Sequence, residues 1–269
     1  MSSDQTDLRD SKQPLLSHLS ELRSRLIKTL IMLTVFFVIF YIFADNIYNF
    51  LVQPYASAVE GEAGRRLIFT ALHETFFTYI RVALFASLFI SLPFLLIQLW
   101  IFIAPGLYRN EKNIVMPYLI ATPLLFVLGS ALVYYVIMPL AIKFFLSFET
   151  IGGNGVLPIQ LEAKVNEYLS LVMRLIIAFG LSFQLPVALT LMARVGFVSA
   201  SSLRKNRKYV IVGVFAMAAL LTPPDPISQI GLGIPILILY ELSIYAVSLI
   251  ENSKNCLLYT SDAADETGR

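Results

Sequence analysis

Residues 76–103 read FFTYIRVALFASLFISLPFLLIQLWIFI, and Arg81 is the one charged residue in this run. A helix needs about 20 mostly apolar residues to cross the hydrocarbon core of a bilayer, so this stretch predicts a transmembrane helix. Five further segments resemble it, and together they predict an all-α integral membrane protein with six transmembrane helices. The predicted spans are residues 27–44, 76–103, 114–140, 168–193, 209–221 and 227–250.

The composition favours lipid surroundings. Apolar residues make up 57% of the 269 residues, charged residues make up 14%, and the mean hydropathy is +0.74. Soluble domains carry about 25% charged residues. The net charge is only +2, and no basic run is interleaved with aromatic residues, so we expect no nucleic-acid partner.

The sequence offers little for catalysis or for a bound metal. Its one cysteine, Cys256, cannot form an intramolecular disulfide, and the two histidines, His18 and His73, lie far apart in sequence. It contains no G-x-x-x-x-G-K loop, no H-E-x-x-H and no G-x-S-x-G motif. We therefore expect no enzyme activity, no catalytic residues, no metal site and no cofactor.

The fifth predicted span is short. Residues 209–221 would form a helix about 20 Å long, whereas the hydrocarbon core is about 30 Å thick. The following run Thr222-Pro223-Pro224-Asp225-Pro226 stops a helix. A short span that thins the bilayer and a re-entrant hairpin with the sixth segment both stay open. The basic residues within 204–208 anchor the start of this helix and favour the short span.

Lysine and arginine placement predicts the orientation. If the N-terminus is cytoplasmic, that side collects twelve basic residues and the other side four. Because cytoplasmic loops are enriched in basic residues, both termini are predicted to be cytoplasmic. The twelve are Arg9, Lys12, Arg23, Arg25, Lys28, Arg109, Lys112, Arg194, Arg204, Lys205, Arg207 and Lys208, and the four are Arg65, Arg66, Lys143 and Lys164.

Two arginines, Arg81 and Arg174, fall inside predicted spans near their outer ends. Snorkelling of each guanidinium to the interface is one interpretation, and a polar face lining a groove is the other. The two outer loops, residues 45–75 and 141–167, are long and mix apolar with polar residues. They could pack together as an outer cap.

Residues 1–252 are predicted to form a single six-helix transmembrane domain, and residues 253–269 a polar C-terminal tail. No cleaved signal peptide is apparent. Residues 256–269 resemble a translated sequencing-adapter or assembly scar, and a native cytoplasmic tail is the alternative.

Four clusters of polar residues and prolines, with one acidic residue, are the candidates for function. Each cluster also has an ordinary interpretation as a helix end, a turn or a solvated face. Glu241 lies inside the sixth predicted span, where an ionisable group is expensive and usually functional. The first cluster is His18 to Arg23, which contains Glu21, and the second is Ser91 to Glu111, which contains Pro93, Phe102, Pro105 and Tyr108. The third is Phe179 to Pro186, which contains Gln184, and the fourth is Leu221 to Gln229, which contains Pro223 and Asp225.

In this order and spacing, the clusters resemble the TatC family of twin-arginine translocases over nearly the whole chain, to about residue 250. The resemblance implies a concave bundle with short fifth and sixth spans. It also implies that Glu21 and Glu111 bind the paired arginines of a signal peptide at the cytoplasmic face. A carboxylate accepts two parallel hydrogen bonds from a guanidinium, and lysine cannot reproduce that geometry. Supporting roles are implied for Arg23, Pro93, Phe102, Pro105, Tyr108, Gln184, Pro186, Pro223 and Asp225.

Gln184 departs from the family pattern, since many members carry glutamate at this position. A fixed negative charge is therefore missing here, although an amide still donates and accepts hydrogen bonds. Glu241 could supply some of the missing acidity, but the sequence does not place it near Gln184.

The resemblance further implies a multi-pass protein of the bacterial inner membrane that nucleates a complex exporting folded proteins with the proton-motive force. Its implied partners are twin-arginine signal peptides, TatA-like and TatB-like single-span proteins at Gly213 to Ala219, the lipid bilayer, and further copies of itself. A small-molecule secondary transporter is the alternative, and it predicts paired broken helices about the midplane.

Overall fold

The computed structural model describes residues 4–60, 65–103, 112–150, 152, 157–221 and 226–266. Regular structure in this part of the chain is helical apart from two isolated β-bridges. Five helical segments are long and apolar enough to cross a membrane, at Leu22–Ile42, Glu74–Ile101, Met116–Leu146, Val165–Val195 and Gln229–Asn252. The prediction of an all-α, multi-pass membrane protein is therefore confirmed.

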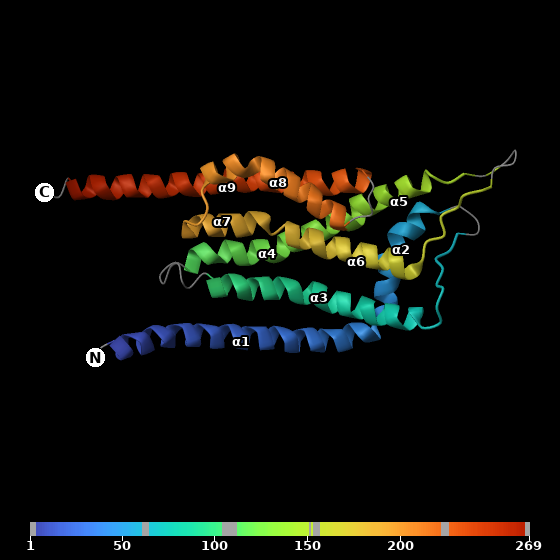
Figure 1. Ribbon diagram of the computed structural model, residues 1–269, viewed down its shortest axis with the longest axis horizontal. Helices are drawn as coiled ribbons and strands as arrows, with labels where there is room; N and C mark the ends of the chain where they lie inside the picture. Colours follow the sequence, from blue (N-terminus) through green and yellow to red (C-terminus); the bar gives the residue numbers. More distant parts are fainter. Residues whose placement is uncertain are drawn as a thin grey trace. The chain divides into compact units, whose positions relative to one another are not determined.

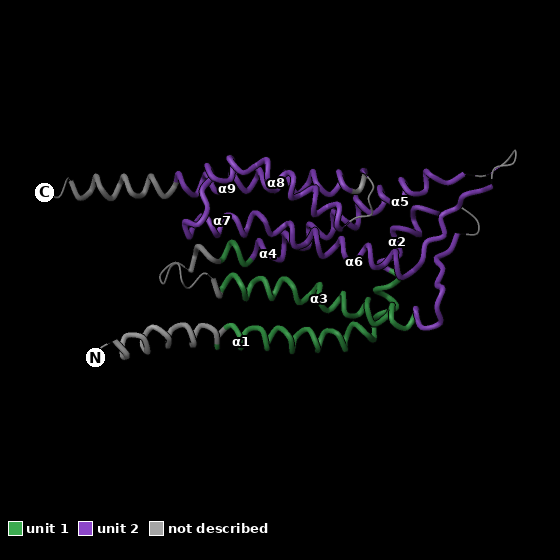
Figure 2. Tube along the Cα trace, viewed as in Figure 1, with its two compact units in different colours: residues 1–49, 75–119 green, residues 50–74, 120–269 purple. Residues whose placement is uncertain are grey.

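Contacts divide the chain into two compact units (Figure 2). Unit 1 comprises residues 1–49 and 75–119, and holds α1 (Asp4–Ile42) and nearly all of α3 (Glu74–Ile103). Unit 2 comprises residues 50–74 and 120–269. α2 (Ala44–Ala58) and α4 (Lys112–Leu132) each contribute to both units. A single domain over residues 1–252 stays a prediction, as does the origin of residues 256–269.

The third span contains a π-helical turn. η2 (Val133–Ile137) joins α4 to α5 (Met138–Leu146), and the N–H of Met138 donates to the carbonyl of Val133. Pro139 follows at once, and proline has no N–H to donate to the carbonyl four residues before it. A wider turn ahead of the proline keeps the helix continuous across this gap.

The fourth span is broken where the sequence carries Pro186. α6 (Val165–Ser182) ends before Phe183 and Gln184, and α7 (Leu185–Val195) begins with Pro186 in its first turn. A proline fits that position because the first N–H groups of a helix have no intrahelical acceptor. α7 ends at Gly196, whose φ of 87° favours glycine.

α8 (Ala200–Leu221) and α9 (Pro226–Glu266) lie side by side, and α7 packs on α9 (Figure 1). The hydroxyl of Tyr240 donates to the carbonyl of Leu203 at 2.9 Å, which joins α8 to α9. α8 is a single helix of 22 residues, but its first half carries four basic residues and it is not among the five apolar spans. The apolar part of α9 is 24 residues long, so the expectation of a short sixth span is wrong.

The two predicted outer loops do pack together within unit 2. The N–H of Ile68 donates to the carbonyl of Ala163 at 3.1 Å, and the N–H of Val165 donates to the carbonyl of Ile68 at 2.9 Å. Arg65 forms a bidentate ion pair with Glu149. We call the described residues among 65–73 and 147–164 the cap, namely 65–73, 147–150, 152 and 157–164. The predicted loop boundaries were too wide, because α2 occupies residues 44–58 and α5 extends to Leu146.

Acidification will loosen the cap. The Arg65 guanidinium, and next the N–H of Leu161 at 2.6 Å, hold the pKa of Glu149 at about 2, below its ordinary value of 4.5. A lowered folded-state pKa contributes stability above about pH 4.5 and loses it as the pH falls towards 2. Because water screens this pair, we expect a loss of about 1 to 2 kcal/mol. Thermal unfolding at pH 7 and pH 3 measures it.

The matched control for this prediction is the exposed pair between Lys164 and Glu167, 3.7 Å apart in the same region. Glu149→Gln will lower the melting temperature at pH 7 and flatten its pH dependence, whereas Glu167→Gln will do neither. An unchanged pH profile in Glu149→Gln would show that other groups cause the acid sensitivity.

Candidate functional site

The first candidate region lies in unit 1, where the start of the first apolar span meets the last turns of α3. The Nη1 atom of Arg25 on α1 donates to the Oε1 atom of Gln98 on α3 at 2.6 Å. Both side chains are partly buried. This charge-assisted hydrogen bond joins α1, which contains Glu21, to α3, which ends at Ile103 before Glu111 in the sequence.

The structure leaves the predicted carboxylate pair itself undescribed. The backbone of Glu21 is part of α1, one turn before Arg25, but its side chain lies outside the described residues, as does the side chain of Phe102. Residues 104–111, with Pro105, Tyr108 and Glu111, also lie outside them. Of the supporting residues, Arg23 is exposed on α1 and Pro93 lies inside the continuous helix α3. The joint role of Glu21 and Glu111 stays a prediction.

The second candidate region is the break in the fourth span. Gln184 is 5% exposed, and its Nε2 atom donates to the main-chain carbonyl of Thr122 on α4 at 3.0 Å. Its Oε1 atom is buried and has no hydrogen-bond partner among the described residues. The side-chain amide of Gln184 therefore links the break in the fourth span to α4 through its Nε2 atom, and its Oε1 atom can still accept a hydrogen bond.

Glu241 has a partner that the sequence did not indicate. Its Oε2 atom lies 2.6 Å from the Nη2 atom of Arg207 on α8, and both side chains are about half exposed. Glu241 does lie within an apolar span, as predicted. Arg207 compensates the charge of Glu241, and a role for Glu241 in place of an acid at Gln184 stays a prediction.

The remaining candidates follow α8 in the sequence, up to the start of α9. Pro223 and Asp225 lie outside the described residues. Beside them, the Nε2 atom of Gln229 donates to the carbonyl of Phe215 at 3.1 Å, which ties the start of α9 back onto α8.

Sequence reasoning missed the partners rather than the polar residues themselves. Gln184 was named as a candidate, and Gln98 lies within the predicted cluster Ser91 to Glu111. Nothing in the sequence pointed to the carbonyl of Thr122 or to Arg25 as what they bind. The ion pair between Arg65 and Glu149 was also missed, although both residues fall in loops that were expected to meet.

The described residues include no group of three or more histidine, cysteine, aspartate or glutamate side chains placed to hold a metal ion. What they do contain is a set of apolar helices joined by a few polar contacts. This combination defines a multi-pass helical membrane protein.

Comparison with known proteins identifies the family. The family model described as "Sec-independent protein translocase protein (TatC)" matches residues 17–235. The protein of that name from Magnetococcus marinus is 46% identical over 91% of this chain and 88% of its own length. The Escherichia coli K12 protein is 40% identical over 88% of each chain. The chain belongs to the TatC family.

A solved structure agrees with this assignment. The crystal structure titled "Twin Arginine Translocase Receptor- TatC" is 34% identical, covers 86% of this chain and 98% of its own, and superposes with a TM-score of 0.73. A second crystal structure of such a receptor, in the detergent DDM, matches with the same TM-score at 35% identity.

Proposed function

We propose that this protein is the receptor subunit of a twin-arginine translocase, a transport role rather than a catalytic one. The observation that carries the proposal is the match to a twin-arginine receptor over 98% of that chain's length at 34% identity. No observation on this chain favours a small-molecule transporter over this function.

In this proposal the arginine pair of a signal peptide binds Glu21 and Glu111 at the cytoplasmic face. Each guanidinium offers a planar fork of N–H donors that fits a carboxylate, and the rounded ammonium of lysine does not. The Arg25 to Gln98 hydrogen bond supports the proposal because it holds together the two helices that lead to these carboxylates.

We further propose six spans with both termini in the cytoplasm of a bacterium, and α8 as the short fifth span. The charged first half of α8 would then lie at the cytoplasmic interface, and its apolar half would thin the bilayer. Single-span TatA-like and TatB-like partners would pack on Gly213 to Ala219, where small residues permit close approach. The proton-motive force would drive transport by the assembled complex.

Site-specific photo-crosslinking tests the receptor function. A twin-arginine peptide will crosslink to probes placed beside Glu21 and Glu111, and a twin-lysine peptide will crosslink about tenfold more weakly, because charge-assisted bidentate contacts are lost. Glu21→Ala and Glu111→Ala will each weaken crosslinking to the arginine peptide. Equal crosslinking by the two peptides would remove the carboxylate mechanism and reopen the transporter alternative.

Removing the hydrogen bond between Arg25 and Gln98 will weaken signal-peptide binding, although neither residue is proposed to touch the peptide. Gln98→Leu removes the hydrogen bond between Arg25 and Gln98, so α1 and α3 lose this contact near the proposed site. We expect signal-peptide affinity to fall about fivefold. Gln98→Glu keeps an oxygen acceptor and will retain affinity. If Gln98→Leu binds peptide as tightly as the unmodified protein, this contact does not position the site.

A further inference from the structure

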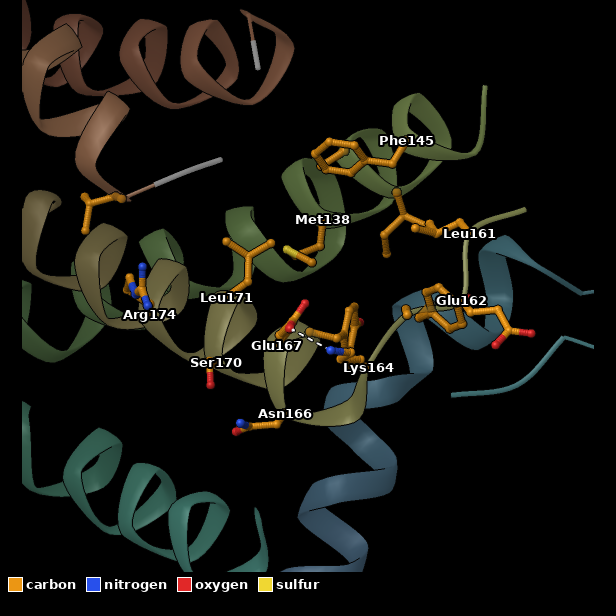
Figure 3. Close-up of a pocket in the computed structure, with 16 residues that line it drawn as sticks. Met138, Phe145, Leu161, Glu162, Lys164, Asn166, Glu167, Ser170, Leu171 and Arg174 are labelled. Atoms are coloured by element: carbon orange, nitrogen blue, oxygen red, sulfur yellow. Dashed lines mark ion pairs between the residues drawn. The ribbon is translucent and has the colours of Figure 1, made fainter. Parts of the chain in front are cut away.

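We propose that a pocket beside α6 binds an anionic phospholipid, with Arg174 holding its phosphate. The pocket has a volume of about 630 Å³ and lies entirely within unit 2, between α5, α6 and the cap (Figure 3). Leu221, the last residue of α8, also lines it. Among the two interpretations of Arg174, the structure favours the second, because this side chain lines a pocket.

The lining of the pocket is amphipathic. Figure 3 shows Leu171 and Met138 pointing toward one another, with Phe145 and Leu161 on the same side of α6. The charged groups stand along the α6 side of the same cavity. The acyl chain of a lipid would lie against the apolar side chains, while its charged headgroup reaches the charged groups of α6.

The charges around the pocket leave one cation to be compensated. Lys164 already has Glu167 as its partner at 3.7 Å, and the carboxylate of Glu162 points away from the cavity in Figure 3. Arg174 is exposed within an apolar span, and no carboxylate pairs with it among the described residues. A cation at membrane depth is costly without a counter-charge.

A phospholipid is the occupant that this environment supplies. Exposed apolar side chains flank the pocket on α5 and beyond it, with Leu140 56% exposed and Phe148 60% exposed. Such surfaces face lipid chains in a membrane protein. Lipid is therefore the solvent around this pocket and the most abundant molecule that could enter it. The planar guanidinium of Arg174 offers N–H donors that match the oxygens of a phosphate, so the headgroup of an anionic phospholipid suits this side chain.

Fluorescence quenching by brominated lipids tests the proposal. Trp100 is the one tryptophan of the chain, so Trp100→Phe with Phe145→Trp places a single reporter in the pocket. The full chain is reconstituted in phosphatidylcholine vesicles that contain brominated phosphatidylglycerol or brominated phosphatidylcholine. We expect the anionic lipid to quench with about fivefold higher relative affinity.

Two sets of controls separate the pocket from the general lipid surface. Arg174→Gln will abolish the preference, and Arg174→Lys will keep most of it, since an ammonium still attracts a phosphate. Arg81→Gln, at the other arginine inside a span, will leave it unchanged. A reporter at Phe148→Trp, outside the pocket lining, will show no preference between the lipids.

Three results would overturn the proposal. Equal quenching by both lipids would show an apolar groove without a headgroup site. No quenching by either lipid would show that protein fills the pocket. An unchanged preference in an Arg174→Gln variant that elutes as a single folded species would assign the headgroup to another residue.

Discussion

Gln184→Glu will destabilise the protein by about 3 kcal/mol at pH 8, although it only replaces the NH2 group of the side-chain amide with an oxygen. The Nε2 atom of Gln184 donates to the carbonyl of Thr122 at 3.0 Å, and a carboxylate would point an oxygen at that carbonyl instead. The side chain is 5% exposed, so water cannot compensate the new charge. Thermal unfolding in detergent measures the loss.

The control for this prediction is Gln184→Leu. It removes the hydrogen bond, but it also removes the buried Oε1 atom that has no partner among the described residues, so we expect a loss below about 1 kcal/mol. Lowering the pH will rescue Gln184→Glu, because a protonated carboxyl group can donate to Thr122. Leucine will show no such rescue. A Gln184→Glu variant as stable as the original protein at pH 8 would mean that a donor reaches this position in the membrane.

This experiment also bears on the family pattern. A glutamate at this position would need a donor or a proton to be stable, because the Thr122 carbonyl cannot supply either. In this chain the amide of Gln184 supplies its own donor, and Glu241 is paired with Arg207. In this chain, the contact of Gln184 with α4 is a hydrogen bond rather than an interaction of a fixed charge.

The spans could be predicted from sequence because they depend on local composition. Long apolar runs such as 76–103 keep that character whatever they pack against, and five of the six predicted spans correspond to apolar helical segments. α8 shows the limit of this reasoning: four basic residues hide the helical continuity of Ala200–Leu221. Predicting the full length of α8 requires the helical periodicity of its side chains rather than their composition.

α2 could have been predicted, and was not. Its buried side chains Leu51 and Tyr55, continued by Val59, recur every four residues, which is the spacing of one face of a helix. The mixed composition of residues 45–75 was interpreted as a loop instead. The hydrogen bond from Arg25 to Gln98 could not be predicted, because it depends on how two helices meet in three dimensions.

Gly129→Ala will destabilise unit 2 by about 2 kcal/mol, because α4 and α6 approach too closely there for a side chain. A Cβ atom at Gly129 would lie 2.8 Å from the carbonyl oxygen of Phe179 and 2.7 Å from the Cγ atom of Phe183. The facing residue Gly180 is equally constrained, since its Cβ would lie 2.6 Å from the Phe126 ring. The Phe183 ring at Gly129 and the Phe126 ring at Gly180 are both buried, so neither ring can move aside without opening a cavity.

Gly213→Ala is the matched control, because it makes the same change inside a helix where no atom lies within 4 Å of the new Cβ. Alanine loses less backbone entropy than glycine on folding, so this variant will be unchanged or more stable by up to about 1 kcal/mol. The two variants therefore separate helix propensity from close packing, with thermal unfolding in the same detergent as the measurement. Equal melting temperatures for the two would show that α4 and α6 can separate without cost, and that the glycines do not hold this contact.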